Sequence, residues 1–218
     1  MPVVLSELVD PTTTALVTCE LQRGVVGDLA PSPELVEVCR ETRLVETAAA
    51  LCTAARACGA RVVHAVVELR GDRAGLSINN PMMAMVTKNP AQVRQGTPAA
   101  DLVPELGPEP EDIEIRRIHG LTPFTSTSLD QVLRNLGVRT VVPVGVSLNE
   151  ALLGLCLSAA DLGYRIALPT DAVAGHPMEY GRDVLQHTLA YLSNLTTSGA
   201  IIEAWRSGES PAPQRSTT

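Results

Sequence analysis

The sequence predicts an α/β fold in which helices cover both faces of a mostly parallel sheet. Short apolar runs rich in β-branched residues alternate with longer stretches of helical spacing along the 218 residues. Nearly continuous apolar strands are typical of parallel sheets, whose strands are buried on both faces. Folds of this class place their chemistry at the carboxyl ends of the strands. The residues that follow each strand are therefore the candidates for function.

The first half of the chain supplies three predicted strands and one long helix. Residues 13–19 (TTALVTC) are apolar and predict the first strand. Residues 43–58 have helical spacing and are rich in alanine, and the glycine that follows them is a common helix stop. Residues 61–69 (RVVHAVVEL) predict the second strand, and residues 112–117 (DIEIRR) predict a short third strand.

The second half of the chain continues this alternation. Gly137 and Gly163 end two of the predicted helices, and Pro143 interrupts one predicted strand. We expect helices at 126–136, 148–162 and 178–197, and strands at 139–145, 164–170 and 199–205.

Residues 70–111 fit the alternation poorly. They form a long connection with one short predicted helix at 81–87. Connections of this length with little regular structure are usually functional, as lids or pocket walls. An irregular surface insertion is the alternative, and the sequence leaves both open.

Length and composition predict one domain over residues 1–206, followed by a Ser/Pro-rich tail at 207–218 that we expect to be disordered. Hydrophobic residues make up 45% of the chain, and 17 basic against 24 acidic residues give a net charge of −7. This balance disfavours nucleic acid and anionic membranes as partners. No apolar run is long enough to span a membrane, and no signal peptide is recognisable.

The five cysteines are odd in number and lack metal-ligand spacing. They are typical of the small buried hydrophobic residues of a protein in a reducing cytosol. We therefore expect a cytoplasmic protein, and we expect neither a metal nor a cofactor.

Polar side chains follow the first two predicted strands. Glu20 comes directly after the first strand, where a parallel sheet opens its crevice, and Gln22 could reach the same crevice or orient Glu20. Alternation puts Glu68 near the crevice at the end of the second strand, whereas His64 on the same face lies mid-strand, as a core histidine would. A surface or capping role for Glu20 is the alternative.

The third strand ends in RRIHGLTPF, which carries Arg116, Arg117 and His119. One of these groups near Glu20 would pair with its carboxylate and fix its orientation. For any single one of the three, a solvated basic turn is the alternative.

These positions, in this order, resemble the isochorismatase-like hydrolases, also called the cysteine hydrolase superfamily. The resemblance rests on Glu20-x-Gln22, on residues 122–147 (TPFTSTSLDQVLRNLGVRTVVPVGVS) and on residues 159–172 (AADLGYRIALPTDA). It implies a Rossmann-like three-layer α/β/α sandwich with a six-stranded, mostly parallel sheet. It also implies a homo-oligomer, a dimer or a tetramer.

The catalytic set that the resemblance implies is an Asp after strand one, a Lys after strand three and a Cys at the start of the helix after strand four. This chain has Glu20 in place of the Asp, and Ile118 aligns with the Lys between Arg117 and His119. Ala151 aligns with the Cys. The chain therefore departs from the family at all three places.

No other residue is an obvious nucleophile. Cys156 lies roughly 140° around the helix from Ala151, and alternation points Cys19 away from the crevice. Ser147 is the one plausible hydroxyl, but it would need a base within reach, and it could instead shape the turn. A thiol-based acyl-enzyme, as in an ordinary amidase, is disfavoured.

The first hypothesis is a cysteine-independent hydrolase acting on a small polar metabolite, as true isochorismatases work by protonation without a nucleophile. Glu20 would be its acid or base, with Arg117 or His119 as charge partner. The expected substrate-binding residues are Gln22, Glu68, Arg70, Phe124, Ser147, Asn149 and Ala151. Glu68, where the resemblance implies a Gln, argues against isochorismate itself. The second hypothesis is a catalytically silent member that binds a metabolite or acts through its oligomer interface.

Overall fold

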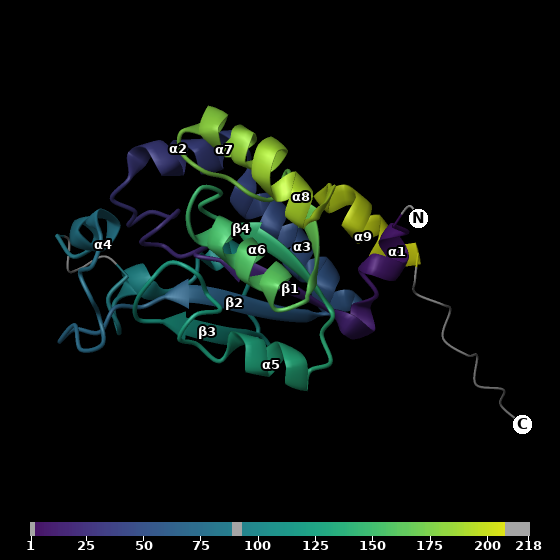
Figure 1. Cartoon of the computed structure of the whole chain (residues 1–218), viewed down its shortest axis with the longest axis horizontal. Coiled ribbons are helices and arrows are strands. Elements are labelled where there is room, and N and C mark those ends of the chain that lie inside the picture. Colours follow the sequence, from purple (N-terminus) through teal and green to yellow (C-terminus); the bar gives the residue numbers. More distant parts are fainter. Residues whose placement is uncertain (1–2, 89–92, 208–218) are drawn as a thin grey trace, which may run out of the picture.

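The computed structural model describes residues 3–88 and 93–207 of the chain. Six strands form one fully parallel sheet in the order β3-β2-β1-β4-β5-β6 (Figure 1). The strands are β1 (Thr14–Cys19), β2 (Arg61–Val67), β3 (Ile113–Arg117), β4 (Thr140–Gly145), β5 (Arg165–Pro169) and β6 (Asn194–Thr196). The predicted α/β fold with a six-stranded parallel sheet is confirmed.

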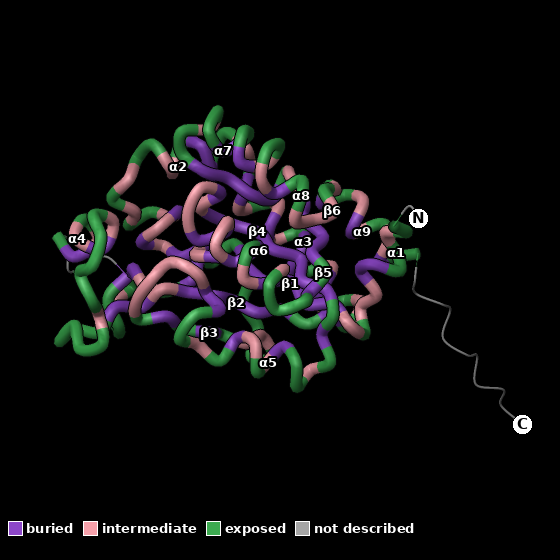
Figure 2. The backbone as a smooth tube through the Cα atoms, in the orientation of Figure 1, coloured by how far each residue is buried: buried purple, intermediate pink, exposed green. Residues whose placement is uncertain are grey.

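Helices cover both faces of the sheet, and each face has its own buried apolar cluster. One cluster contains Leu16 of β1 and packs against α1 (Leu5–Leu8), α2 (Pro33–Glu41), α3 (Leu44–Cys58) and α9 (Ser198–Ser207). The other contains Val17 of β1 and packs against α5 (Leu129–Asn135), α6 (Ala151–Asp161) and α7 (Met178–Val184). Because successive strand residues point to opposite faces, β1 supplies both cores. Figure 2 shows the strands buried between these layers.

The C-terminal part of the chain differs from the sequence prediction. The predicted strand at 199–205 is helix α9, and the sixth strand lies instead at Asn194–Thr196, inside the predicted helix 178–197. Ile201 and Trp205 are both fully buried, and Trp205 Nε1 donates to the carbonyl of Val9 at 2.8 Å. Their i, i+4 spacing is that of one helix face, and a short apolar run does not distinguish this from a strand.

Other predicted helix boundaries differ from the observed ones by a few residues. The predicted long helix 178–197 divides into α7, a π-helical turn at Leu185–Leu189 and α8 (Ala190–Leu192). The predicted helices 126–136 and 148–162 begin later, at Leu129 and Ala151. The sequence pattern did not predict α1 or α2. The expected disorder of the tail concerns residues that, Ser207 apart, lie outside the described ranges.

The carboxyl ends of the parallel strands meet at one edge of the sheet. Cys19 of β1 is paired with Ala65 of β2 and with Gly145 of β4, so the residues after these strands emerge side by side. Helix α4 (Pro81–Val86), from the long connection, stands beyond this edge (Figure 1). Within the described ranges, no helix is long and apolar enough to cross a membrane.

Candidate active site

A cavity of about 620 Å³ opens at the carboxyl edge of the sheet. This volume lies in the range of sites that hold small molecules. Strand ends supply its polar side, and α2 and α4 supply apolar walls. Its polar lining includes Glu20, Arg117, His119, Ser147, Glu150 and His176, and its apolar lining includes Leu35, Leu69, Met82, Met83, Met85 and Val86.

Glu20 projects from the end of β1 into this cavity. Its backbone nitrogen donates to the carbonyl of Ala65 at 2.9 Å, which keeps the chain beside β2 after the strand has ended. Its φ of 55° lies in the left-handed region, which side-chain-bearing residues seldom adopt and which recurs at functional sites. The carboxylate retains 14% exposure and forms an ion pair with Arg117.

Arg117 is buried because β3 alternates. Ile115 and Arg117 face inward, while Arg116 faces the other way and is half-exposed. The Arg117 side chain is 2% exposed; its Nε donates to the carbonyl of Gly120 at 2.9 Å, and its Nη2 donates to Glu20 Oε1. Its Nη1 is buried without a hydrogen-bond partner among the described residues. An unpaired buried donor is costly, so Arg117 is held in place by its bonds to Glu20 and Gly120 at the expense of this nitrogen.

Glu150, which sequence reasoning missed, also lines the cavity. It occupies the N-cap position of α6, yet its side chain makes no capping hydrogen bond. Burial raises the pKa of the Glu150 carboxyl, and the nearby charge of Glu20 raises it further. An acidic residue at a helix start is so common for helix stability alone that its residue type does not distinguish Glu150. Its place directly before Ala151 was the available signal.

His119 and Ser147 meet the same cavity. His119 Nδ1 accepts a hydrogen bond from the Ser77 backbone nitrogen at 3.4 Å, which ties the long connection to the end of β3. The Ser147 carbonyl accepts from the backbone nitrogens of Glu150 at 3.0 Å and Leu152 at 3.1 Å, and so holds the start of α6. The Val146–Ser147 peptide is cis.

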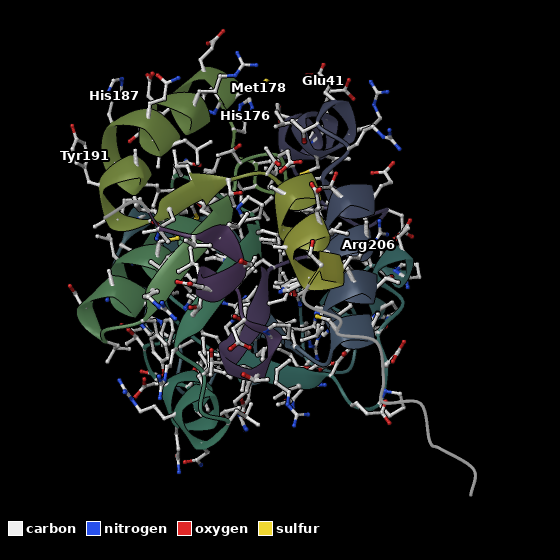
Figure 3. All side chains as sticks on the ribbon, turned by 90° about the vertical axis from the view of Figure 1, so that its right-hand side faces the viewer. Glu41, His176, Met178, His187, Tyr191 and Arg206 are labelled. Carbon is white, nitrogen blue, oxygen red and sulfur yellow. The ribbon has the colours of Figure 1, made fainter. Side chains whose placement is uncertain are left out.

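The long connection forms part of the cavity wall, which decides between the two alternatives for residues 70–111. Three methionines of α4 and Lys88, the single lysine of the chain, line the cavity from this segment. The predicted short helix at 81–87 corresponds to α4. His176 lies between α7 and α2 (Figure 3) and lines the cavity together with Leu35 of α2. Lys88 and His176 carry no local sequence pattern that predicts a site.

Comparison with known proteins identifies the family. Residues 14–200 match the Isochorismatase domain. The chain belongs to the isochorismatase family. Among curated proteins it is 28% identical over 197 residues to the uncharacterised isochorismatase family protein YecD of Escherichia coli O157:H7, covering 88% of this chain and 96% of YecD.

Two further proteins are similar to this chain in sequence or in fold. The chain is 26% identical over 187 residues to streptothricin hydrolase of Streptomyces noursei, covering 86% of this chain but 59% of that protein. A cysteine hydrolase from Pseudomonas syringae pv. phaseolicola 1448A has a similar fold, with a TM-score of 0.78, 20% identity and coverage of 92% and 95% of the two chains.

Several predicted site residues of this isochorismatase-family chain lie outside the described lining of the cavity. Gln22 is fully buried, and its side-chain amide bonds the backbone of Val67, through both nitrogen and carbonyl, and the carbonyl of Ala100. It therefore joins the ends of β1 and β2 to the long connection. Glu68 faces a different pocket and is held by Arg116 at 2.9 Å.

The remaining predicted binding residues have structural partners. Arg70 pairs with Asp72 at 2.7 Å in an exposed loop, and the ring centroid of Phe124 lies 5.8 Å from that of Tyr164. Asn149 Nδ2 donates to the carbonyl of His176 at 3.5 Å. Ala151 is buried in the core cluster on the α6 face. The structure thus groups Glu20, Arg117, His119 and Ser147 of the predicted set, and adds Glu150.

The cysteines do not reach the site. None of the five is among the described residues that line the cavity, and Cys19 and Cys156 are fully buried. Burial raises the pKa of the Cys156 thiol to about 12 and that of Cys19 well above its ordinary value. Since the thiolate is the nucleophilic form, neither residue is available for covalent attack.

His64 is a core histidine, as its mid-strand position predicts. Its Nδ1 lies 2.8 Å from Thr18 Oγ1 and its Nε2 lies 3.2 Å from Asp112 Oδ2. The order Thr–His–Asp resembles a nucleophilic triad, but Thr18 and His64 are both fully buried. The chain of contacts therefore links β1, β2 and the start of β3 and does not face a substrate. Within residues 3–88 and 93–207, no group of three or more His, Cys, Asp or Glu side chains is arranged to hold a metal.

Proposed function

We propose that the chain is a cysteine-independent hydrolase that acts on a small molecule bound in the cavity at the carboxyl edge of the sheet. The observation that carries this proposal is the Glu20–Arg117 ion pair, which lines the cavity and holds a largely buried carboxylate at the carboxyl edge of the sheet. Membership of a hydrolase family supports the same reaction class.

Glu20 acts as the general base. Arg117 holds the carboxylate by one nitrogen, and the carbonyl of Gly120 fixes the guanidinium by another. The carboxylate accepts a proton from water as the water oxygen attacks the electrophilic carbon of the substrate. The positive charge of Arg117 stabilises the negative charge that develops on the substrate oxygen. Arg117 thus takes the role that the family resemblance gives to a lysine.

The substrate carries an apolar portion beside its reactive polar group. Met82, Met83 and Met85 form one wall of the cavity, whereas the charged side chains gather at the strand ends. Methionine side chains are flexible and adapt to irregular apolar surfaces. The expectation of a small polar metabolite is thereby narrowed to an amphipathic one.

The test compares Glu20→Gln with Glu68→Gln on a panel of small esters, amides and enol ethers followed by mass spectrometry. Glu68 is a matched control, because it is also a carboxylate at a strand end and is also paired with an arginine, but outside this cavity. Loss of a positioned base lowers turnover by about 10²–10⁴-fold, so Glu20→Gln should lose that much and Glu68→Gln should not.

Rates are compared per folded molecule, with circular dichroism as the check on folding. Glu20→Asp, which keeps the charge, should retain measurable turnover. Full turnover by folded Glu20→Gln would contradict the assignment. Ligand binding without turnover of any panel compound by the wild type would favour the catalytically silent alternative.

A further inference from the structure

Glu20 and Glu150 bring two carboxyl groups into one cavity from neighbouring strand ends. Cys19 and Gly145 are paired across β1 and β4. Glu20 follows the first of these strands directly, and Glu150 follows the second after the turn that begins α6. Both side chains line the same cavity.

The two carboxyl groups have different surroundings. Glu20 has a buried cation, Arg117, as its partner. The Glu150 carboxyl makes no hydrogen bond or ion pair with the described residues, although the helix that it precedes would favour its charged form. Burial and the charge of Glu20 oppose that effect and raise the pKa of Glu150. The other ionisable groups around the cavity are Glu34, Lys88, His119 and His176.

We propose that Glu150 is the proton donor of the reaction, acting opposite the base Glu20. This inference rests on the proposed hydrolase function. As the bond to the leaving group breaks, its electron pair passes to the leaving atom, which takes the proton of the Glu150 carboxyl. Water supplies a hydroxyl group to the other product and its proton to Glu20. Return of that proton to Glu150 through solvent restores both groups, so substrate and one water become two products.

The assignment of a base to Glu20 and an acid to Glu150 also gives the start of α6 a reactive group. Pairs of carboxyl groups whose surroundings differ are a common way to provide an acid and a base at one pH. Ala151, where the family resemblance implies the nucleophile, is buried in the core and does not line the cavity. The reactive group at the start of α6 is therefore the preceding residue, Glu150.

The first experiment titrates the carboxyl groups by NMR in protein labelled with ¹³C at glutamate, and it needs no substrate. The Glu150 signal is assigned by its loss in Glu150→Gln. We expect its midpoint to lie above those of exposed glutamates, to fall in Glu20→Gln and to stay unchanged in Glu68→Gln. A Glu150 carboxyl that titrates with the exposed glutamates overturns the inference, and the wild-type measurement decides this even if Glu20→Gln folds poorly.

The second experiment uses a compound that the wild type hydrolyses, and compares it with the 4-nitrophenyl ester of the same acid. A leaving group that needs a proton makes the reaction depend on the donor, whereas 4-nitrophenolate leaves readily without one. Glu150→Gln should lower turnover of the first compound by about 100-fold or more and lower that of the nitrophenyl ester much less. It should also remove the fall in rate that deprotonation of Glu150 causes in the wild type as the pH rises. Glu150→Asp should restore part of the rate.

The outcomes separate the two proposals. Turnover lost in Glu20→Gln but intact in Glu150→Gln overturns the role of Glu150 and leaves the proposed hydrolase function standing. Full turnover in both folded variants overturns both. Equal losses on the two substrates in Glu150→Gln would indicate a structural role and would also overturn the proton-donor assignment.

Discussion

Arg116 and Arg117 are adjacent and chemically identical, yet the period of β3 gives them opposite environments. Arg117 is buried with Glu20 as partner, and Arg116 is 54% exposed and pairs with Glu68 and Glu114. The sequence therefore indicates a strand end that reaches the cavity but leaves open which arginine lines it. Alternation counted from buried Ile115 decides it, because residues two apart share a face.

This difference predicts unequal stability effects. Arg117→Met leaves the Glu20 carboxylate largely buried without its cation, and breaking such a pair costs about 3–5 kcal/mol. Arg116→Met also leaves a carboxylate of low exposure, Glu68 at 10%, but Arg116 itself is 54% exposed and its pair is screened by water, so this variant should lose less than Arg117→Met. Urea unfolding of the two variants measures both values. Similar losses would contradict the burial difference on which the site description depends.

Glu68 and Gln22 illustrate why residue types at strand ends do not by themselves define a site. Both are polar and both follow the expected strands. Glu68, however, lies in another pocket, and the side-chain amide of Gln22 is engaged in hydrogen bonds with the backbone. The conformation after the strand decides the direction of a side chain. At Glu20 that conformation is left-handed, which no pattern of residue types predicts for a glutamate.

At the scale of elements, the first three strands are joined through the buried histidine of β2. His64 contacts Thr18 of β1 and Asp112 just before β3. Burial lowers the pKa of His64, although Asp112 acts in the opposite direction. In the unfolded chain the imidazole regains an ordinary pKa of about 6.5, so below that pH the unfolded state binds more protons than the folded state.

The contribution of His64 to the free energy of unfolding should therefore be complete above about pH 6.5. The free energy of unfolding should decrease as the pH falls below that value. Urea titrations at a series of pH values between neutral and mildly acidic measure this slope. His64→Asn should flatten it, whereas replacement of the exposed His176 by Asn should not. A slope that is the same in the wild type and in His64→Asn would contradict the assignment.

Helix α4 is the element whose role the sequence leaves open. A short predicted helix in a long connection is compatible with a surface insertion, and only the tertiary arrangement brings its methionines to the cavity. Met85 is 59% exposed and lines the cavity. An exposed apolar side chain beside a polar site is expected where a ligand covers it.

Met85→Ser should accordingly raise KM by about tenfold with a smaller change in kcat, because the lost contact is made in both the ground state and the transition state. Leu157→Ser is the matched control, since Leu157 is also an exposed apolar residue of a helix but does not line the cavity. Steady-state kinetics on a hydrolysed panel compound measures both. An unchanged KM in Met85→Ser would remove α4 from the substrate site.

At the scale of the whole molecule, apolar periodicity is enough to predict the sheet and its two helical layers. Strands buried on both faces and helices ended by glycine are local signals that agree with the global fold. The C-terminal helix α9 in place of a predicted strand shows the limit of this signal. The seven-residue run 199–205 (GAIIEAW) fits either period, and the bond from Trp205 to the carbonyl of Val9 belongs to the tertiary structure. Glu150 lay beyond prediction for a similar reason, since its role depends on Glu20, 130 residues earlier in the chain.

The central claim is that hydrolysis at this sheet edge proceeds through carboxylates and not through a thiol. The direct measurement is turnover of a hydrolysed panel compound before and after native-state treatment with iodoacetamide, with mass spectrometry locating each alkylated cysteine. Cys19 and Cys156 are buried and Cys58 is half-buried. We predict undiminished turnover even where Cys58 is alkylated. Loss of turnover in proportion to the alkylation of one cysteine would contradict the account.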